Sequence, residues 1–188
     1  MFMGIQLYLV RHGETEENVA NILQGHLPGH LTIRGRAQAR PLRDELASIP
    51  FDALVCSDLL RCRDTADIVN EAHGLPVQPT PLLRERDWGI HTGQSIRSLS
   101  GGIDASAESV DALFARARRF LRALLEQHDG QTVLAVGHGL FNRVIQGALA
   151  GGSIREIPRM NNAEVRCITV AAPLPFADVT EESGFSAD

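Results

Sequence analysis

The sequence predicts an α/β fold with one domain and a largely parallel sheet. Strand-like and helix-like segments alternate along the chain, which is the pattern of strands joined by helical crossovers. The 188 residues, 44% of them hydrophobic, are enough for one well-buried core but few for two domains. We therefore expect a single domain over residues 1–172 and an acidic, flexible tail over residues 173–188.

The expected strands are short runs rich in apolar and β-branched residues. Each of the first three precedes a turn and a helix-compatible stretch, as parallel strands require. A fourth run, near the end of the chain, is expected to join the sheet at an edge. These runs cover residues 4–10, 52–57, 131–136 and 164–171.

The expected helices follow these strands and carry recognisable end signals. Thr32 is a suitable N-cap for the first helix, because its hydroxyl oxygen can accept from a free backbone N–H. Gly74, Gly130 and Gly151 stand where the later three helices should stop, since glycine tolerates the left-handed backbone of a helix end. The four segments cover residues 32–48, 58–72, 108–128 and 140–150.

The charged residues exclude several classes of function. All 18 basic residues are arginine, so Schiff-base catalysis, a pyridoxal phosphate anchor and the P-loop lysine are excluded. The net charge is −5, and the tail accounts for four acids and no base. Phosphate-backbone binding needs clustered positive charge, so we expect no nucleic-acid partner. The arginine-rich run over residues 113–125 is interpreted as the solvated face of an amphipathic helix.

The apolar segments and the cysteines predict a cytoplasmic protein with no membrane partner. No apolar run approaches the ~20 residues that a membrane-spanning helix requires. Residues 1–10 lack the basic start and the long apolar centre of a signal peptide. Cys56, Cys62 and Cys167 are odd in number and lack C-x-x-C spacing, so we expect buried free thiols rather than disulfides or a zinc site.

Two of the expected strands end in the same way, with a histidine and a glycine. LYLVRHGET begins at residue 7 and VLAVGHGLF at residue 133. Ligands of open α/β sheets bind beyond the carboxyl ends of the strands, so His12 and His138 are expected to meet in one crevice. Gly13 and Gly139 should let the backbone turn and leave room beside each ring. One such histidine is most often structural, but two in matching contexts favour a functional site.

A third strand end adds an arginine, in the segment CSDLLRCRDTA. Ser57 or Asp58 is a candidate N-cap, which puts Arg61 in the first turn of the following helix. A cation there opposes the helix dipole at a cost of about 0.3 to 1 kcal/mol, so a neighbour or a ligand must compensate. Two explanations remain open at this point. Arg61 forms an ion pair with Asp58 or Asp64, or it holds an anion together with the helix N-terminus.

Four blocks in this order resemble the histidine phosphatase family, which includes the phosphoglycerate mutases: LVRHGET, SDLLRCRDTA, LLRERDWG and VGHG. The resemblance spans residues 5–170. It implies a three-layer α/β/α sandwich and a phosphohistidine intermediate formed without a metal or other cofactor. By motif, it makes His12 the nucleophile and Glu85 the proton donor. The other positions that it assigns surround the phosphoryl group or line the leaving-group side: Arg11, Arg61 and His138, then Asn18 and Gln24.

The chemistry of phosphate esters agrees with these implied roles. Arginine forks suit the three oxygens of a phosphate, and transfer spreads charge over those oxygens. His138, if protonated, would add a donor. His12 must be unprotonated at one nitrogen, with the other held by a carbonyl or carboxylate, for which a backbone carbonyl near Gly13 is a candidate. A carboxyl group such as Glu85 donates a proton at neutral pH only where burial or nearby negative charge, here the bound phosphate, favours its neutral form.

We expect a phosphatase that acts on a small phosphorylated metabolite. Only 52 residues separate Glu85 from His138, which is short for the capping insertion of a mutase, so an open site should admit water. Departures from the family pattern at the mouth of the site leave the identity of the substrate open, and the sequence carries no signal for the oligomeric state. Arg97 is a candidate specificity contact, and Trp88 is expected to pack beneath its loop rather than stack on substrate.

Four alternatives are kept beside this expectation. They are a phosphoglycerate mutase-type transferase, a protein phosphohistidine phosphatase, a regulator that binds phosphate without turnover, and a zinc hydrolase. The retained His12, Glu85 and His138 disfavour the regulator. The zinc hydrolase is disfavoured because the two histidines lack local ligand spacing such as H-x-x-x-H.

Overall fold

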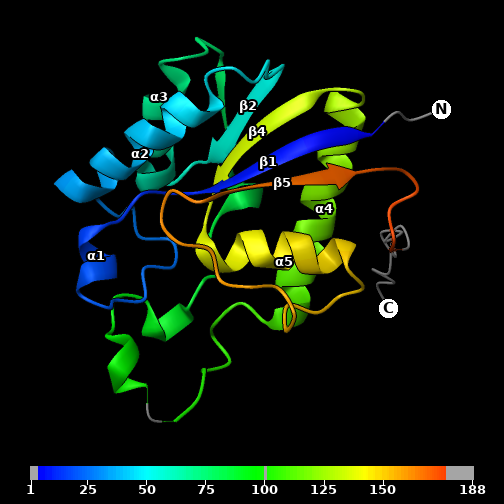
Figure 1. The fold of residues 1–188 in the computed structure, drawn as a ribbon. Coiled ribbons are helices and arrows are strands. Elements are labelled where there is room, and N and C mark those ends of the chain that lie inside the picture. The colour runs from blue at the N-terminus through cyan, green and yellow to red at the C-terminus, as the bar shows by residue number, and fades with distance from the viewer. Residues whose placement is uncertain (1–3, 100, 177–188) are drawn as a thin grey trace, which may run out of the picture.

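The computed structural model describes residues 4–99 and 101–176, and its five strands form one sheet in the order β3-β2-β4-β1-β5 (Figure 1). Neighbouring strands are parallel except at one edge, where β5 pairs antiparallel with β1. The predicted α/β fold is therefore confirmed, with its mostly parallel sheet and its final strand at an edge. The strands are β1 (Ile5–Arg11), β2 (Ala53–Ser57), β3 (Val77–Thr80), β4 (Thr132–Gly137) and β5 (Val165–Val170).

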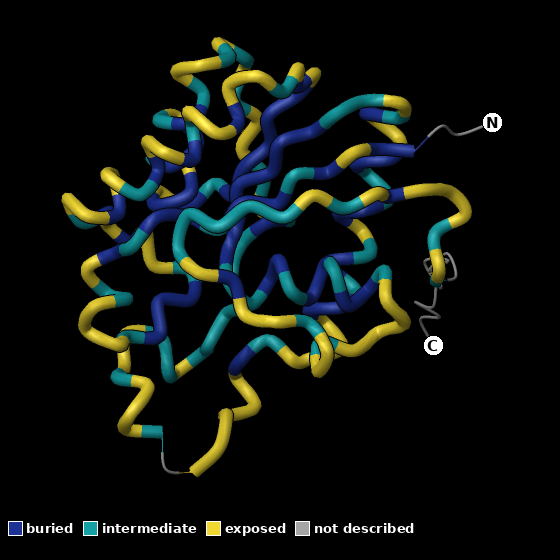
Figure 2. Tube along the Cα trace, viewed as in Figure 1, coloured by how far each residue is buried: buried dark blue, intermediate teal, exposed yellow. Residues whose placement is uncertain are grey.

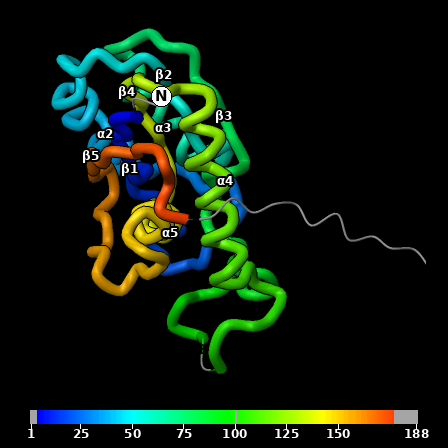
Figure 3. Tube along the Cα trace, turned by 90° about the vertical axis from the view of Figure 1, so that its right-hand side faces the viewer, coloured from blue at the N-terminus to red at the C-terminus, as the bar shows by residue number. Residues whose placement is uncertain are grey.

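Helices cover both faces of the sheet and complete three layers (Figures 1 and 3). Adjacent strand residues point to opposite faces, so Val55 belongs to the core under one pair of helices and Leu54 to the core under the other. The strands β2 and β4 are almost entirely buried, whereas many of the connecting loops are exposed (Figure 2). One face is covered by α2 (Ile33–Leu46) and α3 (Leu60–Asn70), the other by α4 (Val110–His128) and α5 (Gly139–Leu149).

The helix ends follow the predicted signals with one exception. Thr32 caps α2, its Oγ1 accepting from the Gly35 N–H at 2.9 Å, and Gly74, Gly130 and Gly151 all have left-handed φ angles. The predicted cap of α3 by Ser57 or Asp58 is wrong. Leu59 occupies the N-cap position without a side-chain hydrogen bond. The Asp58 carboxylate instead accepts from Arg84.

Several short elements carry no clear sequence signal. β3 contains a proline, which an edge strand tolerates because it needs fewer backbone donors. The short helix α1 and three 3₁₀ turns lie in the connections at the carboxyl end of the sheet. These elements are α1 (Glu16–Val19), η1 (Pro81–Leu83), η2 (Gly89–His91) and η3 (Ile96–Ser98).

Three expectations about individual side chains need correction or completion. Cys56 and Cys62 are buried free thiols as expected, but Cys167 is exposed on the edge strand β5. Arg116 is only 9% exposed, so the solvated-face interpretation of its segment is wrong at this position. At the start of the expected tail, Phe176 packs against the core on the α4 side, and residues 177–188 lie outside the described residues. No helix in the described ranges is long and apolar enough to cross a membrane.

Candidate active site

His12 and His138 meet because the strands before them are neighbours. Arg11 at the end of β1 is in register with Gly137 at the end of β4, so each histidine is the first residue after its strand. The His12 N–H donates to the Gly137 carbonyl at 3.0 Å, and the two ring centroids lie 5.3 Å apart. Both rings are buried. The structure thus brings together two residues that are far apart in the sequence, as their matching strand ends predict.

His12 has one ring nitrogen engaged and one available. Its Nδ1 lies 2.7 Å from the carbonyl oxygen of Gly13, the type of partner expected from the sequence. A carbonyl oxygen only accepts, so Nδ1 carries the hydrogen and Nε2 keeps a lone pair. Burial and the positive charges of Arg61 and Arg11 hold the pKa of His12 well below its ordinary value. The ring is therefore neutral, which is the form that a nucleophile requires.

His138 is also neutral, but its ring is in the other tautomer. Its Nδ1 lies 3.3 Å from Nε of Arg61, which is always a donor, so the ring hydrogen is on Nε2. Burial and the charge of Arg61 hold the pKa of His138 well below its ordinary value. The protonated donor considered from the sequence is thus replaced by a neutral ring, whose Nε2 lies 3.4 Å from the Sγ of Cys62.

Arg61 is fixed by a loop rather than by an acid. Its side chain is 1% exposed and donates to backbone carbonyls of the loop 25–28, among them Gly25 at 2.9 Å. The expected ion pairs do not form, because Asp58 binds Arg84 and Asp64 binds Arg36. The ion-pair explanation of Arg61 is therefore wrong. Burial lowers the pKa of Arg61, but a guanidinium remains charged at neutral pH.

A cavity of about 140 Å³ opens beside His12. Arg11 lines this cavity. Its Nη1 donates to the Met160 carbonyl at 2.6 Å, while its buried Nε has no partner among the described residues. Gly139 makes room for this side chain, since a Cβ there would lie 3.0 Å from that Nε. His138 does not line the cavity, although its neighbour Gly139 does. The other six predicted site residues line it: Arg11, His12, Asn18, Gln24, Arg61 and Glu85.

Gly13 serves close packing and not a left-handed turn. Its φ is not positive, and a Cβ at this position would lie 2.5 Å from the carbonyl oxygen of Gly35. The loop after β1 therefore rests directly on the first turn of α2. This contact fixes the Gly13 carbonyl that engages His12.

Amide side chains complete the wall of the cavity. The Asn18 Oδ1 accepts from the Thr15 N–H and from Asn162 Nδ2, each at 3.2 Å, which leaves the Asn18 amino group for a ligand. Gln24 is 7% exposed, and its Oε1 has no partner in the described ranges. Asn162 was not predicted, although it also donates to the His12 carbonyl at 3.1 Å. Its local sequence, NNAEV, gives no signal for this role.

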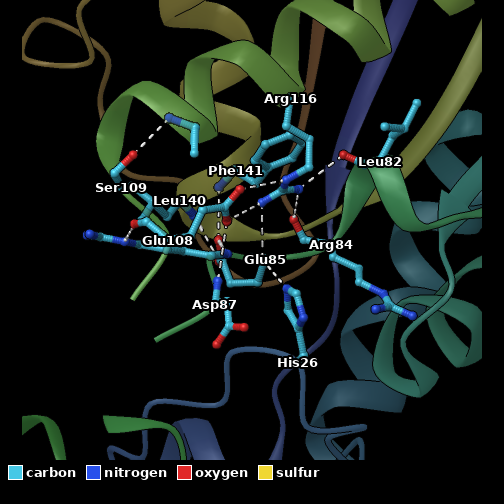
Figure 4. Close-up of polar contacts among 12 residues, drawn as sticks. His26, Leu82, Arg84, Glu85, Asp87, Glu108, Ser109, Arg116, Leu140 and Phe141 are labelled. Atoms are coloured by element: carbon cyan, nitrogen blue, oxygen red, sulfur yellow. Dashed lines mark hydrogen bonds and ion pairs between the residues drawn. The ribbon is translucent and has the colours of Figure 1, made fainter. Parts of the chain in front are cut away.

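The Glu85 carboxylate lies at the N-terminus of α5. Its Oε1 accepts from the N–H groups of Phe141 and Arg86, at 3.1 and 2.9 Å, and its Oε2 accepts from Leu140 at 3.2 Å (Figure 4). Oε2 thus has one hydrogen bond where Oε1 has two. A carboxylate oxygen has two lone-pair sites, so Oε2 is the atom with room for a proton.

Glu85 also lines a second cavity of about 400 Å³, next to the first. Trp88 lines both cavities, with Arg86 stacked 4.7 Å from its ring, so it is part of the site wall rather than buried beneath the loop. Arg97 lines neither cavity, whereas Arg143 and Arg159 line the second. No group of three or more His, Cys, Asp or Glu side chains in residues 4–99 and 101–176 is arranged to hold a metal ion.

Comparisons with known proteins agree with this architecture. The Salmonella typhi adenosylcobalamin/alpha-ribazole phosphatase is 35% identical over 162 residues, covering 78% of this chain and 80% of that protein. The Shigella flexneri alpha-ribazole phosphatase structure superimposes with a TM-score of 0.78 at 30% identity, covering 86% of this chain and 89% of that one. The structure of the mycobacterial glucosyl-3-phosphoglycerate phosphatase in complex with VO3 superimposes with a TM-score of 0.79 at 26% identity, covering 86% of this chain and 90% of that one. Because residues 7–173 also match the sequence profile of the histidine phosphatase superfamily (branch 1), this chain belongs to that superfamily.

Proposed function

We propose that the protein hydrolyses a small phosphate monoester through a phosphohistidine on His12, without a metal. The observation that carries this proposal is the His12 ring, neutral, with Nδ1 engaged by Gly13 and Nε2 free beside two arginines. Such a nitrogen can attack phosphorus directly. Arg11 and Arg61 supply fixed positive charge for the equatorial oxygens, over which the transition state spreads its negative charge.

In the first step, His12 Nε2 attacks phosphorus and the ester P–O bond breaks. The proton on Glu85 Oε2 passes to the departing oxygen, so the alcohol leaves neutral. The negative charge of the bound ester favours the neutral carboxyl group needed for this donation. His138 supports the cradle by holding Arg61, since its Nδ1 accepts from Arg61 and its Nε2 lies 3.4 Å from Cys62 Sγ. The amides of Asn18 and Gln24 complete the cradle.

In the second step, water attacks the phosphohistidine. The Glu85 carboxylate accepts one proton from that water while the P–N bond breaks and its electron pair returns to His12 Nε2. Inorganic phosphate leaves, and both residues regain their starting protonation states. One carboxyl group thus serves as acid and then as base.

Hydrolysis is favoured over mutase chemistry by the openness of the site. The cavity beside His12 shares lining residues, including Trp88 and Glu85, with the larger second cavity, which leaves room for water beside the departing alcohol. The experiment supplies a phosphoglycerate and measures free phosphate and isomerised product in parallel. Phosphate release without isomerisation supports the phosphatase, and isomerised product as the main outcome refutes it.

The substrate class is best approached through the relatives. Alpha-ribazole phosphate and glucosyl-3-phosphoglycerate are the first esters to test, because similar proteins carry those names. A phosphorylated phosphocarrier protein tests the protein phosphohistidine alternative. Binding of phosphate with no turnover of any ester would instead support a regulator.

We also propose that the reaction takes place in the cytoplasm, with neither nucleic acid nor membrane as partner. Cys56, Cys62 and Cys167 are all free, as thiols are in a reducing compartment. The chain carries a net negative charge, which disfavours binding to polyanions. Cell fractionation tests the location, and recovery in the membrane fraction would contradict it.

A further inference from the structure

Arg116 is a buried arginine that none of the roles above uses. It lies on α4, is 9% exposed, and is surrounded by polar partners rather than by water. Its Nη1 donates to the carbonyls of Leu82 and Arg84 at 3.1 and 2.6 Å, and its Nη2 to the carbonyl of Glu85 at 3.3 Å. One guanidinium thus holds three backbone carbonyls of the segment that carries Glu85 (Figure 4).

Glu108 binds both Arg116 and the segment that carries Glu85. Its carboxylate binds Arg116 with two hydrogen bonds, Nε to Oε1 at 2.9 Å and Nη2 to Oε2 at 2.7 Å. Its backbone N–H and carbonyl engage the Asp87 carbonyl at 2.9 Å and the Arg86 Nε at 2.8 Å. The pair therefore holds the chain on both sides of Glu85.

The same guanidinium also touches the surface that receives the Glu85 carboxylate. The Cζ of Arg116 lies 3.9 Å from the ring centroid of Phe141. The backbone N–H of Phe141 is one of the donors to Glu85 Oε1. Arg116 thus contacts both the backbone of Glu85 and a residue that orients its side chain.

We infer that the Arg116–Glu108 pair positions Glu85 for proton transfer to the leaving group, an inference that rests on the acid role proposed for Glu85. The pair touches no reacting atom, so both are positioning residues. Its fixed geometry keeps Oε2 within reach of the departing oxygen, and small displacements of a catalytic group are costly. Loosening the pair should therefore penalise substrates in proportion to their need for a proton.

The test compares p-nitrophenyl phosphate, whose phenolate leaves without help, with an alkyl phosphate that needs protonation. Glu108→Gln should raise the ratio of the two kcat/KM values in favour of p-nitrophenyl phosphate by about tenfold or more. Glu108→Asp, which keeps the charge, should restore part of the wild-type ratio. Asp58→Asn is the matched control, because it breaks a bidentate arginine pair on the same segment without touching the Glu85 carbonyl. An equal change in this control would overturn the inference, since general loosening would then explain the effect.

Folding and coupling are tested with three further variants. The double variant Glu108→Leu, Arg116→Met replaces the buried pair by apolar side chains, which proteins often tolerate, and should raise the ratio while melting cooperatively. In a Glu85→Gln background, Glu108→Gln should leave the ratio unchanged, because both changes act through one carboxyl group. Multiplying effects would refute this route. A raised ratio in Glu85→Gln alone, with none in Glu108→Gln, would remove only the positioning role. An unchanged ratio in Glu85→Gln would remove the acid role as well.

Discussion

The Arg61 Nε donates to the Nδ1 of His138 over 3.3 Å, so one side chain both charges the site and sets the tautomer of its second histidine. The loop 25–28 holds that arginine through backbone carbonyls, which cannot be protonated or lost by mutation of a side chain. The contact links the charge of the cavity to the direction of a ring hydrogen. Arg61 therefore contributes both a positive charge and the hydrogen bond that sets the tautomer of His138.

Arg61→Ala should therefore lose two contributions at once. The variant lacks a guanidinium at the phosphoryl group and leaves the His138 tautomer unset, so kcat/KM should fall by about 10²- to 10³-fold or more. Steady-state kinetics with p-nitrophenyl phosphate measures this loss. Arg63→Ala, an exposed arginine on the same helix, is the control and should keep its activity. An unchanged kcat/KM in Arg61→Ala would take this arginine out of the site.

Glu85→Gln tests the acid role by leaving-group dependence. Glutamine keeps the shape and one acceptor oxygen but cannot give up a proton to the alcohol. The rate with alkyl phosphates should drop by about 10²-fold or more, and the rate with p-nitrophenyl phosphate by much less. Glu71→Gln, an exposed carboxylate paired with Arg43, controls for the loss of a charge. Equal losses on both substrates would contradict the assignment.

The two buried histidines should make folding sensitive to acid. Their pKa values lie well below the ordinary 6.5 in the folded protein and near 6.5 in the unfolded chain. Below pH 6.5 the unfolded chain therefore binds more protons, so the free energy of unfolding should fall by up to about 1.4 kcal/mol per pH unit for each histidine. Urea unfolding at several pH values measures this slope.

Replacing both rings should flatten that pH dependence. The double variant His12→Asn, His138→Asn lacks the two groups that are kept neutral, so its stability should change less between pH 7 and lower pH. His30→Asn is the control, because His30 is exposed on a loop. A double variant as acid-sensitive as the wild type would show that other groups dominate.

Metal removal separates this account from a zinc hydrolase. The proposed charge stabilisation comes from Arg11 and Arg61, so prolonged treatment with a chelator should leave kcat/KM unchanged. Phosphate release from p-nitrophenyl phosphate before and after treatment measures this directly. Loss of activity, restored by adding zinc, would require a different mechanism.

The sequence predicted the parts of the site that local order and neighbouring strands determine. His12 and His138 follow strands whose ends must lie together in a parallel sheet, and Thr32 sits at a recognisable helix start. The burial of Arg61 could not be predicted in this way, because its partners are backbone carbonyls of a distant loop. Every residue has a backbone carbonyl, so residue types do not indicate which carbonyls accept these hydrogen bonds.

Other features depend on contacts that no local pattern encodes. Arg116 stands in a run of arginines on one helix, and only the tertiary fold turns it inward to the segment of Glu85. Asn162 reaches the carbonyl of His12 from the connection before β5. Cys167 is exposed because β5 is an edge strand with a partly open face, which its apolar sequence does not reveal.

The most direct test of the central claim is to trap the phosphoenzyme and locate its phosphorus. After rapid mixing with substrate and quenching in base, mass spectrometry and ³¹P NMR should find phosphate on Nε2 of His12, since Nδ1 is engaged by Gly13. The His12→Ala variant should form no such species and release no phosphate. Phosphate on another residue, on Nδ1, or steady turnover by His12→Ala would contradict the account.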